Sequence, residues 1–332
     1  MQTAGKIQEW LDKFWLEENP DSAYNAAIST VLSGLWNLQL DCEGQPQQFS
    51  LLNLPCVVCS TFGGEWKNAV EVNAAWLLLY AAFYVLDKIE DQEVDNIPST
   101  GLEENVLINV TTGLILNAGL ILSKLAGEEK FDLATLNSLL VTFNRMALKV
   151  CAGQHVDLTI RVPDLSQVWQ SVAAKSGDFF ALACWIGARA ATDEPDLLES
   201  MTIYGRHLGI LIQIANDIEG LWGKDGSNSD LANGKVTLPV AFALSVLPPA
   251  DTTILKQLIL AKNKNSEASA RRLILSCGGL IYLMLEAEKH RQQAKAALNG
   301  LPMNEPHREE LLNILDRLAR IAEDKGIKQV QG

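Results

Sequence analysis

The sequence has little that would suit an exported, membrane-spanning or nucleic-acid-binding protein. The longest uninterrupted apolar run, residues 74–86, has 13 residues, whereas a membrane-spanning helix needs about 20. The first fifteen residues, MQTAGKIQEWLDKFW, lack the apolar core of a signal peptide. Basic residues are scarce, with 27 Lys and Arg against 40 Asp and Glu and a net charge of −13, and a nucleic-acid binder needs a basic face. We therefore expect a cytoplasmic protein with no transmembrane segment and no nucleic-acid partner.

Cysteine is also used sparingly, with six residues in the chain. Cys56 and Cys59 form a CVVC pair, but no second pair or His cluster follows to complete a zinc site. The other four are scattered in apolar surroundings, where Cys behaves as a small hydrophobe. Reduced cysteines in a cytosolic protein are the simplest interpretation.

Strict apolar–polar alternation, which marks half-buried strands, is rare, and helical spacing prevails. Hydrophobic residues make up 48 % of the chain and charged residues 20 %, which is ample for a large core. We expect long helices over residues 71–90, 105–125, 133–151, 201–222, 268–298 and 307–325. The segment 71–90 is apolar on every side, as in a helix at the centre of a bundle. The pattern predicts one all-α domain over residues 1–332, a bundle of about ten or more helices.

Charged groups stand out where the apolar segment 71–90 ends. Asp87 and Asp91 are four residues apart on one helical face, and Glu90 can share it. Carboxylates one turn apart repel each other unless a cation or proton lies between them, and Mg²⁺ suits such a pair. A helix that simply emerges into solvent would look the same.

A second polar constellation lies in another apolar helix. Gln213, Asn216, Asp217 and Gly220 fall at helical spacings within GILIQIANDIEG. A self-satisfied helix interior would explain the two carboxamides, but a buried carboxylate is harder to explain in that way. The flexible segment 222–233 follows, and Asp230 and Lys235 come at and just beyond its end, so this region could hold a metal ion and a phosphate together.

Two shorter elements lie between these constellations. Gly153-Gln154-His155, with Asp157 close behind, follows a long apolar helix, and Lys175-Ser176-Gly177 lies between two apolar stretches. Each element is weak alone, since a single His such as His155 is more often a structural hydrogen-bonding residue than a ligand.

Taken in order, these elements resemble the trans-isoprenyl diphosphate synthase family, the class I isoprenoid enzymes, over residues 63–298. The first motif of that family matches Asp87 to Asp91, and its GQ..D element matches Gly153, Gln154 and Asp157. The remaining matches are the KTG-like element at Lys175-Ser176-Gly177, the GxxxQxxDDxxD motif at Gly209, Gln213, Asn216, Asp217 and Gly220, and the D-L-x-x-GK-x-TLP element from Asp230 to Pro239. The resemblance implies an all-α bundle whose two acidic motifs face each other across a deep apolar cavity.

The resemblance also implies the chemistry: Mg²⁺ and cationic side chains draw the diphosphate from an allylic prenyl substrate. The catalytic residues it implies are Asp87, Asp91 and Asp217. The metal ligands it implies are Asp87, Glu90, Asp91, Asn216 and Asp217. The diphosphate-binding residues it implies are Lys175, Gln213, Asp230 and Lys235. The residues of the prenyl pocket it implies are Ala82, Phe83 and Gln154, and the half-blocked floor at Phe83 suggests a C15 or C20 substrate.

Several positions depart from the family pattern. Lys88 stands where a second Asp is expected, and Asn216 and Gly220 replace two Asp of the second motif. Against the terpene-synthase pattern NDxxSxxxE, Gly220 and Lys224 replace the Ser and the Glu. The basic residues that hold isopentenyl diphosphate are missing, since residues 45–55 contain no Lys or Arg and VDNIPSTG stands at the second basic element. Ordinary chain elongation is therefore disfavoured.

Three interpretations remain. The first is a terpene-synthase-like enzyme that ionises one allylic diphosphate and cyclises it or quenches it with water. The second is a prenyltransferase with a peptide or aromatic acceptor, similar to the bacterial enzymes that prenylate a peptide Trp. The third is a non-catalytic partner subunit of a prenyl diphosphate synthase. Family habit implies a homodimer, with a heteromer under the third interpretation.

Overall fold

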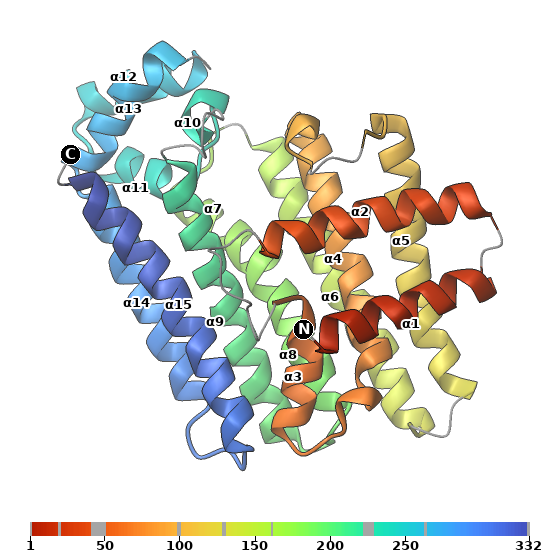
Figure 1. Cartoon of the computed structure of the whole chain (residues 1–332). Helices are drawn as coiled ribbons and strands as arrows, with labels where there is room; N and C mark the ends of the chain where they lie inside the picture. The colour runs from red at the N-terminus through yellow and green to blue at the C-terminus, as the bar shows by residue number, and fades with distance from the viewer. Residues whose placement is uncertain are drawn as a thin grey trace. The chain divides into compact units, whose positions relative to one another are not determined.

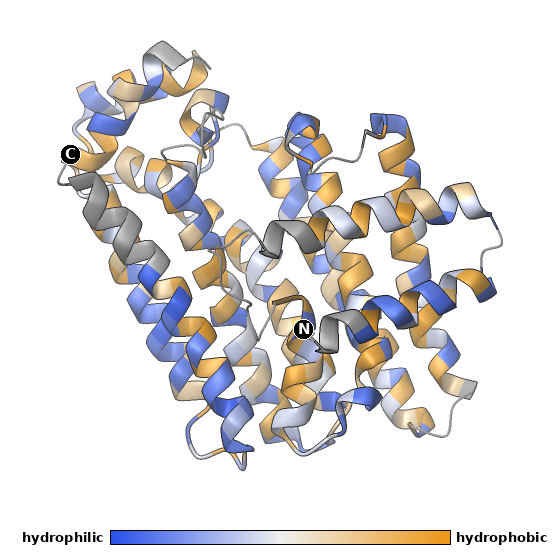
Figure 2. Cartoon of the chain, viewed as in Figure 1, coloured by the Kyte–Doolittle hydropathy of each residue, from blue (hydrophilic) through white to orange (hydrophobic). Residues whose placement is uncertain are grey.

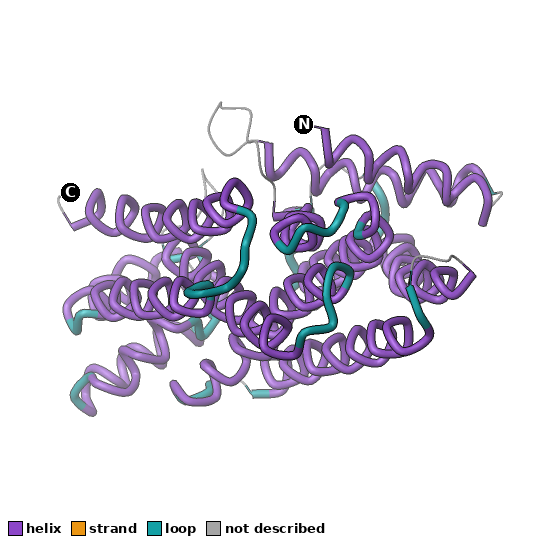
Figure 3. Tube along the Cα trace, turned by 90° about the horizontal axis from the view of Figure 1, so that it is seen from below, coloured by secondary structure: helices purple, strands orange, loops and turns teal. Residues whose placement is uncertain are grey.

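A computed structural model describes residues 2–18, 21–40, 51–97, 101–127, 131–160, 162–221, 229–261 and 264–330. Helices make up nearly all of these residues, and none of them lies in a strand (Figure 3). Contacts divide the chain into two compact units. Unit 1 comprises residues 1–144, 183–198 and 302–307, and unit 2 comprises residues 145–182, 199–301 and 308–332. The all-α expectation is confirmed, whereas one domain over residues 1–332 stays a prediction.

Unit 1 is built around α4 (Val70–Glu90), which packs along α5 (Glu104–Lys124). The helices α1 (Gln2–Glu18) and α2 (Ser22–Leu40) cross these two helices (Figure 1), and α3 (Leu54–Thr61) also packs against α4. From Val70 to Leu79 every residue of α4 is buried, which is why its sequence is apolar on every side. The expected helices 71–90 and 105–125 are thus confirmed.

Four helices have residues in both units: α6 (Leu133–Thr159), α8 (Asp178–Arg189), α9 (Pro195–Gly220) and α15 (Glu305–Val330). The structure extends the expected helix 133–151 by two turns, so that Gly153, Gln154 and Asp157 lie on α6. The expected helix 201–222 begins earlier, at Pro195, because proline is well placed in the first turn of a helix.

Unit 2 also contains α7 (Leu165–Val172), α10 (Asp230–Asn233), α11 (Leu238–Val246), α12 (Pro249–Leu260), α13 (Lys264–Ser276), α14 (Gly279–Ala297) and α15 (Glu305–Val330). The helix α15 is the expected helix 307–325. Around α11, a buried cluster joins α10, α11, α12 and α13, with Leu231, Val240, Leu255 and Ile274 among its members. Burying each such side chain contributes about 1.5–3 kcal/mol.

The expectation of one helix over residues 268–298 is wrong. The chain breaks between α13 and α14, which meet at 61°. Gly278 has φ +83° there, a conformation that favours glycine and ends a helix. A side chain on the next residue, Gly279, would meet the carbonyl oxygen of Ile274 at 2.9 Å. This Gly-Gly pair turns α14 away from α13.

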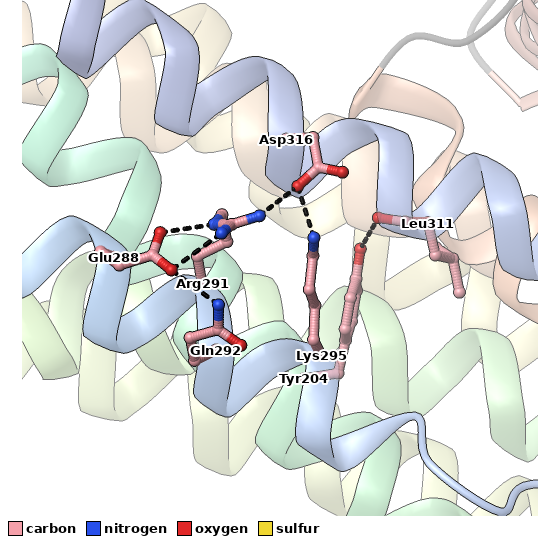
Figure 4. A network of polar contacts seen from close by, with 7 residues as sticks. All are labelled: Tyr204, Glu288, Arg291, Gln292, Lys295, Leu311 and Asp316. Carbon is pink, nitrogen blue, oxygen red and sulfur yellow. Dashed lines mark hydrogen bonds and ion pairs between the residues drawn. The ribbon is translucent and has the colours of Figure 1, made fainter.

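Polar contacts connect α9, α14 and α15 within unit 2 (Figure 4). The buried Tyr204 hydroxyl on α9 donates to the carbonyl oxygen of Leu311 at 2.9 Å. Arg291 and Lys295 of α14 both reach Asp316 of α15 at 2.6 Å. The polar face of these two outer helices is visible as blue ribbon in Figure 2.

By length and composition, α4 and α5 could each cross a membrane, and the bent pair formed by α13 and α14 could count as a third span. The apolar window of α4 is 72 % buried inside the fold, as its place in unit 1 requires, whereas that of α5 is 39 % buried. The expectation of no transmembrane segment therefore stays a prediction.

Candidate functional site

The first acidic motif occupies the last turn of α4, in unit 1. The N–H of Asp91 donates to the carbonyl oxygen of Asp87 at 2.9 Å, so the two carboxylates follow one another along one face. Both side chains are partly buried, and Glu90 is exposed. The ammonium of Lys88 pairs with Glu93 at 2.7 Å, and the Glu93 side chain is only 10 % exposed. The cation that interrupts the motif is therefore neutralised by a carboxylate of its own.

An aromatic column precedes this motif on α4. Trp76 and Tyr80 stack at 5.7 Å, and Tyr80 and Tyr84 follow at 6.5 Å. Burial, with the neighbouring Tyr80 phenol and the carboxylates of Asp87 and Glu93, raises the pKa of Tyr84 to about 12. Tyr84 is thus a neutral phenol beside the acidic motif.

Two of the expected pocket residues lie on α4 as well. Ala82 is fully buried, and Phe83 is partly buried. The third, Gln154, lies on α6 in unit 2, with its Oε1 atom buried. That these three residues line a prenyl pocket stays a prediction.

The elements around Asp157 and Lys175 meet in unit 2. Between α7 and α8, residues Ala173–Gly177 form one turn of π-helix, a feature that often marks functional sites. Lys175 of this turn pairs with Asp157 of α6 at 2.8 Å, and the Ser171 hydroxyl donates to the same carboxylate. A Cβ on Gly153 would lie 2.8 Å from the Cβ of Ala174, so glycine permits the close contact between α6 and the π-turn.

The second motif packs against the other side of the π-turn. Gly209 has its Cβ position 2.1 Å from the carbonyl oxygen of Ser176, so α9 can approach only with glycine there. The Ser176 hydroxyl donates to Gln213 Oε1 at 2.9 Å, and Gln213 Nε2 donates to Asp217 Oδ1 at 2.7 Å. The Leu238 N–H, at the start of α11, donates to Asp217 Oδ2 at 2.9 Å. A continuous chain of hydrogen bonds therefore joins the π-turn, α9 and α11.

Asp217 is 3 % exposed. Burial, and to a smaller extent the charge of Asp230, raise the pKa of its carboxyl to about 7, against the bonds from Gln213 and Leu238 and the charge of Lys175, which lower it. The carboxyl is a buried acid close to its midpoint at neutral pH, with Asp230 and Lys175 within electrostatic reach.

The other second-motif positions lie on the same stretch of α9. Asn216 is exposed. At Gly220, a Cβ atom would lie 1.9 Å from Asp230 Oδ2. Asp230 begins α10, which Ser229 caps, and its carbonyl oxygen accepts the N–H of Lys235 at 2.9 Å. Cys42 and Lys224 lie outside the described residues.

Unit 2 thus brings together Lys175, Gln213, Asp217 and Asp230, as the motif order predicts, and Lys235 lies in the segment between α10 and α11. The first motif lies in unit 1, so its placement opposite the second across a cavity stays a prediction. Sequence reasoning missed two partners. Glu93 could have been found from its spacing to Lys88, whereas Ser171 has no sequence signal.

The carboxylates of the two motifs can be compared with the ligands that a Mg²⁺ site requires. Mg²⁺ is held by one or two carboxylates and substrate phosphates, with several waters. Asp87 and Asp91 fit this description. At the matched positions of α9, Asp217 has both oxygens hydrogen-bonded and Gly220 has no side chain, so α9 itself offers no open carboxylate there. Among the described residues, no three or more His, Cys, Asp or Glu gather as a preformed metal site.

Comparison with known proteins decides the family, because the model of the polyprenyl synthetase family matches residues 55–275. The chain belongs to the polyprenyl synthetase family. Members of this family are prenyl-diphosphate-utilising class I enzymes, and the resemblance stated from the motifs is confirmed.

Curated relatives of this polyprenyl synthetase family member have different activities. It is 30 % identical to the tryptophan prenyltransferase ComQ of Bacillus subtilis subsp. natto over 181 residues, 54 % of each chain. It is 26 % identical to a geranylgeranyl diphosphate synthase of Sulfolobus acidocaldarius, over 72 % of this chain and 76 % of that one. It is 30 % identical to heptaprenyl diphosphate synthase component 2 of Geobacillus stearothermophilus, over 48 % and 51 %. The matches to ComQ and to component 2 span about half of those proteins.

Solved structures share the fold over nearly the whole chain. The geranylgeranyl pyrophosphate synthetase of Pyrococcus horikoshii superposes with a TM-score of 0.77 at 21 % identity, covering 96 % of this chain and 98 % of that one. The heptaprenyl diphosphate synthase of Staphylococcus aureus gives a TM-score of 0.77 at 17 % identity, covering 96 % and 97 %. The all-α fold of this polyprenyl synthetase family member is therefore the isoprenyl synthase fold.

Proposed function

We propose that this protein ionises an allylic prenyl diphosphate of C15 or C20 with Mg²⁺ and transfers the prenyl group to an acceptor other than isopentenyl diphosphate. One observation carries the proposal: unit 2 brings Lys175, Gln213, Asp217 and Asp230 together, while the basic elements that the family pattern uses for a second diphosphate are missing from the sequence. The similarity to ComQ, whose name states that it is a tryptophan prenyltransferase, supports a peptide or aromatic acceptor.

In this proposal, different residues bind the metal ion and neutralise the diphosphate. Asp87 and Asp91, with Glu90 beside them, would hold Mg²⁺, which neutralises the diphosphate as its bond to the allylic carbon breaks. Lys175 and Lys235, both in unit 2, would supply positive charge to a bound diphosphate.

Two further groups, one in each unit, have a role in this proposal. The hydrogen-bonded series from Ser176 through Gln213 to Asp217 fixes the wall on which the diphosphate lies. Tyr84, the partly buried last ring of the stacked series Trp76, Tyr80 and Tyr84, would offer an aromatic face to the allylic cation.

The test is product analysis with purified protein, Mg²⁺ and farnesyl or geranylgeranyl diphosphate. We expect diphosphate release that depends on a Trp-containing peptide or an aromatic acceptor and yields a prenylated acceptor. Release without acceptor, giving a hydrocarbon or alcohol, would support cyclisation or water quenching instead. A longer prenyl diphosphate formed with isopentenyl diphosphate would refute the proposal, as would turnover that requires a second synthase chain.

A matched pair of variants tests the metal-binding role of the first motif. Asp87→Asn should lower diphosphate release at least about a hundredfold, because it removes a charge-stabilising ligand of the leaving group. Asp95→Asn makes the same charge change at an exposed residue and should leave the rate within about twofold. Equal rates in the two variants would contradict the assignment of Asp87.

A further inference from the structure

The helices α11 to α14 differ in charge from the rest of the chain. Residues 238–285, from the start of α11 to the second turn of α14, contain five Lys and Arg but two Asp and Glu, a net charge of +3. The whole chain carries −13, which leaves −16 on the other 284 residues. One of the two acids, Glu267, is paired with Arg271 on α13, whereas Lys256 and Arg272 are exposed. The segment is therefore a basic region in an acidic protein.

These four helices pack against one another within unit 2. The helix α11 contacts α12, α13 and α14, and α13 contacts both α12 and α14. A buried apolar cluster joins α11, α12 and α13, which lie together in Figure 1. The basic residues and the exposed side chains of residues 238–285 thus belong to one packed part of unit 2.

The same part of unit 2 exposes large apolar side chains. At the start of α14, Ile281 and Leu285 are 63 % and 67 % exposed, one turn apart on one face of the helix. Tyr282 is half-buried and stacks on Phe242 of α11 at 4.2 Å. Val246, one turn beyond Phe242, is also exposed. We call these five residues the α11–α14 patch.

The chemistry of the α11–α14 patch and its surroundings is that of a lipid-binding surface. Trp169 of α7 adds a second amphipathic ring, since its Nε1 atom donates to the Tyr282 hydroxyl at 2.7 Å. Trp and Tyr favour the boundary between water and lipid, because one end of each ring system is apolar and the other is polar. Exposed apolar residues combined with Lys and Arg bind membranes that contain anionic lipids.

The other helix with several exposed apolar residues differs in charge. The helix α5 exposes Ile108, Leu116 and Leu120, but its residues 105–123 include no charged residue. This helix itself therefore offers no cation to a lipid headgroup. Charge complementarity thus favours the α11–α14 patch as the surface that meets an anionic membrane.

We propose that the α11–α14 patch docks this protein on the surface of a membrane that contains anionic lipids. Ile281 and Leu285 enter the boundary between the headgroups and the acyl chains, and Lys256 and Arg272 attract the anionic headgroups. The acidic remainder of the chain repels the membrane only weakly where it lies more than about 8 Å away, the Debye length at physiological salt. This inference goes beyond the proposed function, since it involves no prenyl substrate.

The experiment is co-sedimentation of the full chain with sucrose-loaded vesicles of phosphatidylcholine, either pure or with about one-third phosphatidylserine. Each Lys or Arg near an anionic surface contributes roughly a fivefold factor to binding. The wild type should therefore bind the vesicles with phosphatidylserine at least about tenfold more tightly than the pure phosphatidylcholine vesicles.

A first pair of variants tests the apolar contact. Ile281→Ser combined with Leu285→Ser should weaken binding to the anionic vesicles at least about tenfold, because two exposed apolar side chains no longer enter the lipid. The matched control is Leu16→Ser combined with Leu133→Ser, which removes two equally exposed leucines from unit 1 and should bind as the wild type does.

A second pair tests the charge. Lys256→Gln combined with Arg272→Gln should weaken binding to the anionic vesicles at least about tenfold and leave binding to pure phosphatidylcholine unchanged. Lys13→Gln combined with Lys67→Gln gives the same net charge by removing two exposed lysines of unit 1, and should bind as the wild type does. Circular dichroism melting curves show whether each variant is folded, and the charge variants test the proposal even if a serine variant does not fold.

Three results would overturn the inference. The first is a wild type that does not bind the anionic vesicles, and the second is a pair in which the test variant and its control bind equally. The third is a lower sedimentation coefficient of the Ile281→Ser and Leu285→Ser variant without lipid, which would make the patch a contact between two copies of the chain. Because no prenyl diphosphate is present, these results do not depend on whether the protein transfers a prenyl group.

Discussion

Replacing Asp217 by Asn removes an ionisable group from a deeply buried position of unit 2 while preserving the shape of the side chain. Asn can accept the Leu238 N–H through its carbonyl oxygen and donate to Gln213 through its amide nitrogen. Gln213 then turns its own amide over, and the Ser176 hydroxyl, which both donates and accepts, follows. The substitution should therefore retain the hydrogen bonds and change only the protonation equilibrium.

The size of the effect follows from the pKa of Asp217, which burial raises from 3.8 to about 7. Between these values the folded chain binds a proton that the unfolded chain does not, so stability falls as pH rises. The contribution is complete below about pH 4 and is lost once pH exceeds about 7. At 1.36 kcal/mol per unit of pKa difference, the full change is on the order of 4 kcal/mol.

The assay is urea unfolding of the wild type and Asp217→Asn, without metal, from about pH 5 to about pH 8.5. The wild type should lose about 3 kcal/mol relative to the variant over this range, and the variant should be the more stable protein above neutral pH. All other titrating groups are common to both proteins, so their difference isolates Asp217. Parallel curves would refute the reasoning, because they would mean that Asp217 is ionised in the folded chain throughout.

Other perturbations test separate features. Gly209→Ala places a methyl group 2.1 Å from a carbonyl oxygen of the π-turn and should cost several kcal/mol in urea unfolding. Gly119→Ala, with open space at its Cβ position, should instead gain roughly 0.5–1 kcal/mol; equal effects would contradict the packing. Burial and the charge of His207 lower the pKa of His290 to about 4, so stability should fall between about pH 6.5 and pH 4, and a His207/His290 double alanine variant that keeps this slope would disprove it. The homodimer stays a prediction, and α5 offers a test of it because Leu116 is 69 % exposed there: Leu116→Glu should shift the sedimentation coefficient from dimer to monomer if α5 forms the interface, and an unchanged value would place the contact elsewhere.

The fold was predictable wherever local sequence decides it. The helix α4 is apolar on every side because it is buried on every side, so composition alone revealed both its existence and its place. The break at Gly278 was missed because the helical pattern of residues 268–298 continues across it, and one left-handed residue changes the direction without changing the pattern. Fold prediction failed where a single backbone angle mattered more than periodicity.

For the candidate site, the sequence indicated which residues take part, but it did not indicate which groups form their hydrogen bonds and contacts. The order of the motifs identified Asp217, Gln213 and Lys175, which the structure brings into one cluster. The donor to Asp217 Oδ2 is a backbone N–H at Leu238, and every residue except proline carries such a group, so no residue type signals it. The contact of Asp230 with Gly220 could likewise not be predicted from the sequence, because glycine has no side chain whose chemistry would indicate a partner.

The direction in which the Lys175 side chain points depends on the π-turn Ala173–Gly177, because this turn changes the rotation of the chain about the helix axis. One extra residue is accommodated there, and each residue of an α-helix rotates the chain by about 100°. Deleting Ala173 or Ala174 would allow α7 to continue into α8 as ordinary helix, with its length hardly changed. The ammonium of Lys175 would then rotate away from Asp157, and the diphosphate of the proposed function would lose one of its two lysines although both remain in the sequence.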